Sequence, residues 1–209
     1  MKTLIIDFGM GNLGSVRRAF EECGADAFIS DDPGKMESAD HVVLPGVGAF
    51  VDGMARLRRG GWEEAIQEAV IEDAVPLLGI CLGMQLLADN GYEGGEECGL
   101  KLIPGEVRRL DPVDPLVRVP HVGWNEVHRE RDHPLFSGIA NGSDFYFVHS
   151  YHFIPLNPDD VLATTPYCGS FVSAVQSGNA LGVQFHPEKS GQPGFRLLRN
   201  FLKWRGGLC

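Results

Sequence analysis

The segment Gly79-Ile-Cys81-Leu-Gly83-Met-Gln85 constrains the fold of this chain more than any other. Residues 76–80, before the cysteine, form an apolar run of the length expected for a buried strand, and residues 82–88 have the apolar spacing of an amphipathic helix. Cys81 therefore lies at a sharp strand-to-helix turn, where small flanking residues relieve steric crowding. This pattern is typical of a nucleophile elbow and predicts a sheet with a sulfur atom projecting above it.

The place of Cys81 at the start of a helix predicts a reactive thiol. Free N–H groups and the positive end of the helix dipole favour thiolate over thiol, and the thiolate is the nucleophile. The alternative is a buried structural thiol, which is the commoner role of a lone cysteine. A catalytic role requires a partner base elsewhere in the chain.

A histidine and a carboxylate near the C-terminus are candidates for that base and its support. Residues 171–176 and 180–185 read as two strands joined by a Ser-Gly-Asn turn, so His186 follows a hairpin. The side chains of His186 and Glu188 point to the same face of an extended segment, because the two residues are two positions apart. Pro187, which lies between them, is expected to end the strand. Glu188 can accept the second ring proton of His186, set its tautomer and stabilise imidazolium. A solvated His-Pro-Glu turn is the alternative reading.

A glycine-rich loop supplies candidate donors for a negatively charged oxygen. Residues 41–44 read as a strand that runs into Pro45-Gly46-Val47-Gly48, where glycines let backbone N–H groups approach a ligand. With the N–H of Leu82, directly after the cysteine, this loop can form an oxyanion hole. A simple turn or a phosphate-binding loop fits the same residues.

Strands and helices alternate along the first half of the chain, which indicates an α/β protein with a mainly parallel sheet and helices on its faces. Strand-like residues 4–7, 27–29, 41–44 and 76–80 are interrupted by helical spacing at 13–23 and 62–73. Strand-like segments at 105–110, 145–149 and 171–185, with a helix at 194–204, predict a mixed sheet with an antiparallel extension. Residues 91–99 are expected to form a mobile surface loop. Ligands in such folds bind at the carboxyl ends of the strands.

These motifs resemble those of the class I glutamine amidotransferases, which use a Cys-His-Glu triad. The resemblance rests on Gly79-Ile-Cys81-Leu-Gly-Met-Gln85 and on His186-Pro-Glu188. Within that family the chain resembles the glutaminase subunit of imidazole glycerol phosphate synthase. Blocks along the whole chain carry this closer resemblance: Ile5-Ile-Asp-Phe-Gly-Met-Gly-Asn-Leu13, Pro45-Gly-Val-Gly48, Pro120-His-Val-Gly-Trp-Asn125, Tyr146-Phe-Val-His-Ser-Tyr151 and Gly182-Val-Gln-Phe-His-Pro-Glu-Lys-Ser190. It implies one flavodoxin-like amidotransferase domain over residues 1–209.

The resemblance implies hydrolysis of glutamine, with Cys81, His186 and Glu188 as the catalytic residues and with no cofactor or metal. The residues expected to bind glutamine or its oxyanion are Gly46, Val47, Gly48, Leu82, Gln85, Ser150 and Tyr151. For Gln85, an ordinary surface position is the alternative. His121 and His149 are not expected to bind a metal, because neither has an acidic companion at ligand spacing.

The resemblance also implies a partner, a separate barrel-shaped cyclase subunit that forms a heterodimer with this chain and uses its ammonia in histidine biosynthesis. The candidate interface residues are Asn12, Trp124, Tyr146 and Lys189. Trp124 is a candidate anchor, because aromatic residues are enriched in binding hot spots, and core packing is the alternative. Arg118 and Val122 stand where the family pattern leads us to expect lysine and methionine. A peptide flip in the Val47–Gly48 region is our hypothesis for how ligand occupancy at the synthase switches the glutaminase on.

Composition and charge narrow the classes of function that the sequence allows. The net charge of −10, without a basic cluster beyond residues 56–59, argues against nucleic acid as a main partner. No apolar run is long enough to span a membrane and no signal peptide is apparent, so we expect a cytosolic protein. The five cysteines show no C-x-x-C spacing, which indicates neither a disulfide framework nor a zinc site. Cys23, Cys98, Cys168 and Cys209 are expected to be passive thiols.

Three other functions fit parts of the sequence. The same glutaminase chemistry can serve another synthase, for example one that aminates a surface sugar. A non-catalytic subunit that stabilises a partner can keep the same scaffold, although an intact triad speaks against it. A cysteine protease or general hydrolase follows from the triad alone, and glutamine hydrolysis that depends on a partner would separate these classes.

Overall fold

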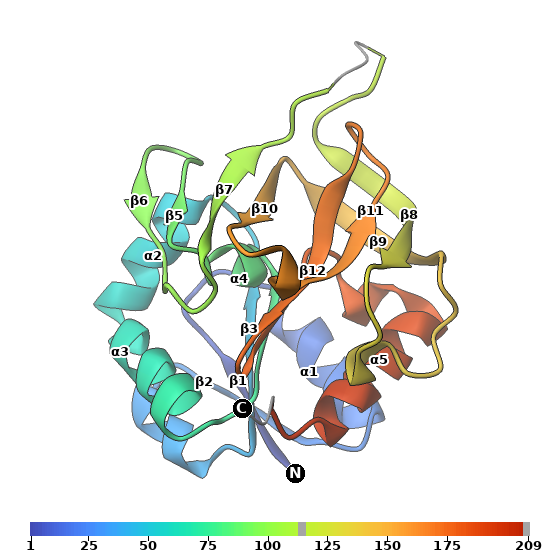
Figure 1. The fold of residues 1–209 in the computed structure, drawn as a ribbon. Helices are drawn as coiled ribbons and strands as arrows, with labels where there is room; N and C mark the ends of the chain where they lie inside the picture. Colours follow the sequence, from blue (N-terminus) through green and yellow to red (C-terminus); the bar gives the residue numbers. More distant parts are fainter. Residues whose placement is uncertain (113–115, 207–209) are drawn as a thin grey trace.

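Five parallel strands form the centre of the fold (Figure 1), in a computed structural model that describes residues 1–112 and 116–206. They are β1 (Lys2–Ile6), β2 (Asp26–Ser30), β3 (His41–Gly46), β4 (Leu77–Cys81) and β13 (Ala180–Val183). Their order across the sheet is β2-β1-β3-β4-β13, and each strand runs parallel to its neighbour. The strand that carries the cysteine is therefore paired on both edges, which fixes its position.

Helices cover both faces of this parallel block. The helices are α1 (Leu13–Glu22), α2 (Phe50–Arg59), α3 (Trp62–Gln67), α4 (Leu82–Gln85) and α5 (Gly191–Lys203). In Figure 1, α2 and α3 lie to the left of the sheet, and α1 and α5 lie to its right. Short helical turns connect other elements, namely η1 (Pro33–Ser38), η2 (Glu68–Glu72), η3 (Pro134–Phe136), η4 (Pro158–Asp160) and η5 (Pro187–Lys189).

Alternating side chains along the buried strands make two separate cores. In β1, Leu4 and Ile6 pack in the core that contains residues of α2 and α3, whereas Ile5 packs in the core with α1 and α5. This alternation follows from the two-residue period of a strand, and an apolar residue at every position marks a strand buried on both faces. Each fully buried apolar side chain in these cores contributes on the order of 1.5–3 kcal/mol.

The second half of the chain adds the antiparallel extension that the sequence predicts. Its strands are β7 (Gly105–Arg109), β8 (His121–Arg129), β9 (Ser143–His149), β10 (Tyr151–Pro155), β11 (Val161–Thr165) and β12 (Phe171–Ser177), with the short β5 (Asn90–Gly91) and β6 (Glu97–Cys98). Strand β12 is antiparallel to β13, and β8 pairs with both β9 and β11. The predicted α/β class, with a parallel sheet covered by helices and an antiparallel extension, is confirmed.

The helix expected over residues 82–88 is shorter than the sequence suggests. It ends at Gln85, because the carbonyl groups of residues 86–89 accept hydrogen bonds from the N–H groups of residues 99–103 rather than from a continuing helix. The helix expected over residues 62–73 changes form at Glu68, where Asp73 N–H donates to Glu68 O across a wider turn. The apolar spacing predicted both helices, but the end of the first depends on hydrogen bonds from residues 99–103, which that spacing does not reveal.

The segment expected to be a mobile loop, residues 91–99, includes the end of β5 and all of β6, and these two strands pair with each other. Arg58 on α2 fixes this hairpin, with its guanidinium 2.8 Å from Glu97 Oε1 and 2.8 Å from the carbonyl oxygen of Cys98.

The described part of the chain contains no helix long and apolar enough to cross a membrane.

Candidate active site

Cys81 lies at the junction of β4 and α4 with a strained backbone. Its φ is 55° and its ψ is −109°, an uncommon conformation for a residue with a side chain. Such strain is typical of nucleophile elbows, where the turn lifts the reactive atom out of the sheet. The side chain is 6% exposed. The expected strand, turn and cysteine are therefore present in the structure.

Two glycines make this turn possible by allowing backbone segments to approach closely. A Cβ on Gly83 would overlap the carbonyl oxygen of Leu44 on the neighbouring strand β3. A Cβ on Gly79 would lie 2.6 Å from the carbonyl oxygen of Gly83. These positions accept only glycine without movement of the backbone, which explains the Gly-x-Cys-x-Gly spacing.

His186 and Glu188 form a buried pair close to this turn. His186 Nδ1 lies 2.8 Å from Glu188 Oε1, and their side chains are 4% and 2% exposed. The pair is not held by a continuous strand as expected, because β13 ends at Val183 and Glu188 lies in the helical turn η5. Pro187 starts that turn, which brings the carboxylate back toward the imidazole.

Ser190 fixes the backbone on which His186 stands. Its hydroxyl donates to the carbonyl oxygen of His186 at 2.6 Å and accepts from the N–H of Tyr146 at 3.0 Å. The N–H of His186 in turn donates to the carbonyl oxygen of Tyr146 at 2.9 Å. The histidine is thus connected to β9 on both sides of its peptide.

The environment of His186 favours a protonated ring. Burial lowers its pKa, but the interactions with Cys81 and with Glu188 outweigh that effect and raise the pKa to about 9. Its Nε2 atom is buried and has no well-aligned hydrogen bond within the described residues, so this is the nitrogen that remains for Cys81. Catalytic hydrogen bonds are commonly loose before substrate binds.

A cavity of about 370 Å³ opens above the cysteine. Besides Cys81, the predicted site residues that line it are Val47, Gly48, Leu82, Gln85, Ser150 and Tyr151. Gly46 does not line this cavity. Gly46 pairs with Cys81 across the sheet. A Cβ at this position would lie 2.9 Å from Leu82 Cβ, so Gly46 allows β3 to pack closely against the cysteine turn. Gly48 has a φ of +117°, which favours glycine.

Sequence reasoning missed three polar residues at this site, namely Gln184, Glu93 and His149, of which Glu93 and His149 line the cavity. Gln184 is fully buried, accepts from Gln85 Nε2 at 3.0 Å and has its own Nε2 3.7 Å from Cys81 Sγ. Its position two residues before His186 in an extended segment was the available signal. Glu93 lines the cavity from the segment between β5 and β6. Burial raises the pKa of Glu93, Asp52 adds to this, and the Phe50 backbone opposes it.

The four candidate interface residues lie near one another. Trp124 is 57% exposed, which excludes the alternative of core packing, and its ring meets Tyr146 edge-on at 6.0 Å. Lys189 Nζ lies 5.6 Å from the centroid of Tyr146. Asn12 and Lys189 line a second, very small cavity of about 10 Å³ next to His186 and Glu188. Asn12 also caps α1 by accepting from Ser15 N–H.

Strands β8 and β9 present an apolar face around Trp124. Val122 and Val148 are opposite one another in the β8–β9 register, as are Trp124 and Tyr146. Val122 is 57% exposed, so the position that departs from the family pattern lies on this face. Exposed apolar side chains gathered on one surface are typical of a binding face.

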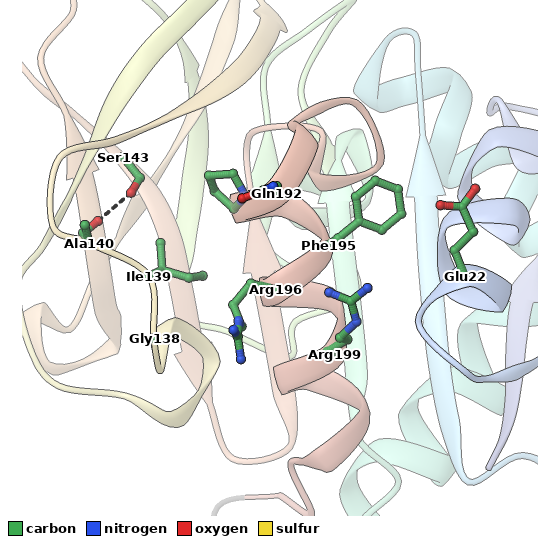
Figure 2. Close-up of a pocket in the computed structure, with 10 residues that line it drawn as sticks. Glu22, Gly138, Ile139, Ala140, Ser143, Gln192, Phe195, Arg196 and Arg199 are labelled. Carbon is green, nitrogen blue, oxygen red and sulfur yellow. Dashed lines mark hydrogen bonds between the residues drawn. The ribbon is translucent and has the colours of Figure 1, made fainter.

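A larger cavity, of about 540 Å³, lies away from the cysteine (Figure 2). Arg196 and Arg199 project from α5 beside it, and Ser143 donates its hydroxyl to the carbonyl oxygen of Ala140 on the opposite side. Among the described residues, the lining includes the Ser143 hydroxyl but no thiol and no imidazole that could act as its base.

Cys23, Cys98 and Cys168, the other cysteines that the structure describes, do not line the cavity above Cys81. Cys23, Cys98 and Cys168 are free thiols, and burial raises the pKa of both Cys23 and Cys168. Cys209 lies outside the described residues. Within the described ranges, no group of three or more His, Cys, Asp or Glu side chains is arranged to hold a metal ion.

Comparison with known proteins places the chain among related sequences. The family model for glutamine amidotransferase class-I matches residues 4–204. The imidazole glycerol phosphate synthase subunit HisH of Moorella thermoacetica is 52% identical over 197 residues, covering 94% of this chain and 92% of that protein. HisH of Chromobacterium violaceum is 46% identical over 215 residues, covering 100% of both chains. HisH of Mesorhizobium japonicum is 44% identical over 216 residues, covering 98% of this chain and 100% of that one.

Solved structures show the same fold at lower sequence identity. A glutamine amidotransferase crystal structure superposes with a TM-score of 0.75 at 22% identity, covering 96% of this chain and 97% of that one. PurLQS from Thermotoga maritima gives a TM-score of 0.74 at 18% identity, with 97% of both chains covered. With the family match over residues 4–204 and full-length relatives at 44–52% identity, the chain belongs to the class-I glutamine amidotransferases and, within them, to the HisH family of imidazole glycerol phosphate synthase subunits.

Proposed function

We propose that this protein is the glutaminase subunit of an imidazole glycerol phosphate synthase, which hydrolyses glutamine and supplies ammonia for histidine biosynthesis. The observation that carries this proposal is the cavity above Cys81 together with the buried His186–Glu188 pair beside it. Membership of the HisH family supports the choice of synthase.

In the proposed reaction, the sulfur of Cys81 attacks the side-chain amide carbon of glutamine after its proton has passed to His186. The oxygen of that amide becomes negative, and backbone N–H groups of the Gly48 segment and of Leu82 stabilise it. His186 then donates its proton to the nitrogen, the C–N bond breaks, and ammonia leaves a γ-glutamyl thioester on Cys81.

Hydrolysis of the thioester completes the cycle. His186, neutral after protonating the leaving group, takes a proton from water as the water oxygen attacks the thioester carbon. The C–S bond breaks, glutamate forms, and the sulfur and imidazole return to their starting states. Glu188 accepts from Nδ1 throughout, which fixes the ring and stabilises its charged form.

The cavity also offers groups for the rest of the glutamine molecule. Its α-ammonium group requires an acceptor, and Glu93 is the carboxylate that lines the cavity among the described residues. Gln85 and the Ser150–Tyr151 segment line the same space and provide polar groups that fix the orientation of the substrate.

The proposed partner is a cyclase subunit that docks on the face around Trp124. Released ammonia is lost to solvent as ammonium unless an acceptor lies close to the site, so the glutaminase requires a synthase beside it. The exposed Trp124, with Tyr146 and Lys189, forms a patch next to the His186–Glu188 pair, and these three residues with Asn12 are the proposed contacts. We propose a cytoplasmic heterodimer, in keeping with the biosynthetic role of the relatives.

Replacing the nucleophile tests the proposed reaction. Cys81→Ala, assayed in the presence of the partner, is expected to lower glutamate production by at least about 10⁴-fold, because no thioester can form. The matched control Cys98→Ala removes an exposed thiol and is expected to leave the rate within about twofold. Glutaminase activity retained in Cys81→Ala would rule out this mechanism.

A further inference from the structure

Two buried histidines outside the catalytic pair are joined by a hydrogen bond. The antiparallel register of β8 and β9 places His121 opposite His149, with His121 Nδ1 3.1 Å from His149 Nε2. His149 Nδ1 lies 2.8 Å from the carbonyl oxygen of Tyr151. At the other end, Asn125 Nδ2 lies 3.2 Å from His121 Nε2. The two residues are 3% and 6% exposed, so the contact between their rings is shielded from solvent.

The groups at the two ends of this chain of hydrogen bonds determine which ring nitrogens of His121 and His149 carry a hydrogen. A carbonyl oxygen cannot donate, so His149 Nδ1 carries the hydrogen directed at Tyr151. A neutral His149 then has a bare Nε2, which must accept from His121 Nδ1. His121 Nε2 is therefore bare as well and accepts from the Asn125 amide, whose Nδ2 also donates to the carbonyl oxygen of Pro166 at 3.2 Å.

The surroundings keep both rings neutral. His121 stacks on Tyr167 with 3.9 Å between ring centroids and on Phe147 at 4.9 Å, and burial lowers its pKa to about 4. Burial lowers the pKa of His149 to about 3, and the rings of His121, His152 and His186 add to this effect while the bond to Tyr151 opposes it. Each ring is therefore a fixed donor and acceptor at neutral pH.

The Tyr151 carbonyl oxygen connects the two histidines to Gln85. It accepts a second hydrogen bond from Gln85 Nε2 at 2.9 Å, and the same Nε2 donates to Gln184 Oε1 at 3.0 Å. Both N–H groups of the Gln85 amide are thereby occupied. Its Oε1 atom is the remaining polar atom, and it belongs to a residue that lines the cavity above Cys81.

We propose that His121 and His149 are positioning residues for glutamine binding, which fix the Tyr151 carbonyl and so orient the Gln85 amide with its acceptor toward the substrate. This inference rests on the proposed function, because it assigns the cavity to glutamine. Without the pair, the Tyr151 carbonyl loses one of its two donors, and the Gln85 amide is free to rotate and present its N–H groups instead.

The first test is the position of the hydrogens and requires no activity. Long-range ¹H–¹⁵N spectra of the full chain at pH 7 distinguish protonated from bare ring nitrogens. Both rings are expected to carry one hydrogen, on Nδ1. A hydrogen on Nε2 of either ring, or a doubly protonated ring, would overturn the inference even if the protein is an active glutaminase.

The second test separates positioning from general stability. His121→Phe keeps a stacked ring but removes the donor to His149, and it is expected to raise KM for glutamine about tenfold while kcat changes by less than about threefold. His121→Asn retains a donor close to the position of Nδ1 and is expected to recover KM to within about threefold of the parent. The control Tyr167→Phe keeps the stacking ring and removes only the hydroxyl bond to the Arg118 carbonyl oxygen.

The outcomes are distinct. An unchanged KM in His121→Phe would overturn the inference, as would an equal loss in His121→Phe, His121→Asn and Tyr167→Phe, which indicates only a damaged core. If His121→Phe does not fold, the tautomer measurement still decides. A parent protein without glutaminase activity would instead refute the proposed function, while the tautomer result would stand by itself.

Discussion

At the scale of single residues, the proposed chemistry depends on the protonation state of His186. Its pKa of about 9 means that the imidazole carries a proton at neutral pH, ready for the departing ammonia. Glu188, 2.8 Å from Nδ1 and almost fully buried, is one cause of this state. Removing its charge while keeping an acceptor therefore tests the role of the carboxylate directly.

Glu188→Gln is expected to shift the pH dependence of the reaction. In the parent, kcat/KM for glutamate production should fall as the pH rises through about 9, because His186 loses its proton there. In the variant, the residual activity should fall at lower pH, because the neutral amide no longer stabilises imidazolium. Glutamate rather than ammonia is the product to measure. As a control, Glu126→Gln alters an exposed carboxylate that pairs with His128, and an equal shift in both variants would contradict this role for Glu188.

At the scale of elements, the strand-to-helix turn at Cys81 is specified by backbone crossings. Gly83 lies against the carbonyl oxygen of Leu44, and Gly46 lies against the side chain of Leu82, so β3 and the start of α4 approach more closely than a side chain at either glycine would allow. Strand β4 is paired with β3 and β13 on its two edges and cannot shift to make room.

Gly83→Ala is expected to destabilise the protein by about 3 kcal/mol or more, since its Cβ would overlap backbone atoms that cannot rotate away. Gly14→Ala is the matched control, because nothing lies within 4 Å of a Cβ built at that helical position. Urea unfolding of both variants measures the difference. A Gly83→Ala protein as stable as Gly14→Ala would contradict the proposed packing of the turn.

The elements differ in how far the sequence alone predicts them. Hydrophobic periodicity identified the parallel strands and the cysteine turn, because burial on both faces leaves a continuous apolar run. The end of α4 could not be predicted, since it depends on hydrogen bonds to residues 99–103. The hairpin of β5 and β6 likewise depends on Arg58, about 40 residues earlier in the chain.

The same limit applies to the site. The sequence alone identified Cys81, His186 and Glu188, because the residues beside them form the Gly-x-Cys-x-Gly and His-Pro-Glu patterns. Gln184 and Glu93 did not, because a polar residue becomes informative only when it is known to be buried beside a cavity. His121 and His149 were considered only as metal ligands, and their contact across β8 and β9 depends on a register that the sequence did not provide.

At the scale of the whole molecule, several histidines are buried or half-buried as neutral groups. Burial lowers the pKa of His121 and His133 to about 4 and that of His149 to about 3, and it also lowers the pKa values of His41 and His152. Below pH 6.5 the unfolded chain binds protons at these positions that the folded chain does not bind. Stability is therefore fully present above about pH 6.5 and is lost as the pH falls toward 4.

His133→Asn is expected to reduce this acid sensitivity. Asparagine can keep the acceptor for Leu135 N–H that His133 Nδ1 provides, and it does not titrate. Each such histidine contributes a slope of at most about 1.4 kcal/mol per pH unit. The melting temperature should therefore fall less between pH 7 and pH 5 in His133→Asn than in the parent, or in the control His128→Asn at an exposed position. An equal fall in all three proteins would refute this assignment.

The measurement that tests the proposed function most directly is glutamate production from glutamine by the purified chain, first alone and then with the cyclase subunit and its nucleotide ligand. A glutaminase that is gated by its synthase should be slow alone and at least about tenfold faster in the complex. A rate that does not respond to the cyclase would contradict the proposed partner, and the absence of glutamine hydrolysis under both conditions would contradict the proposed reaction itself.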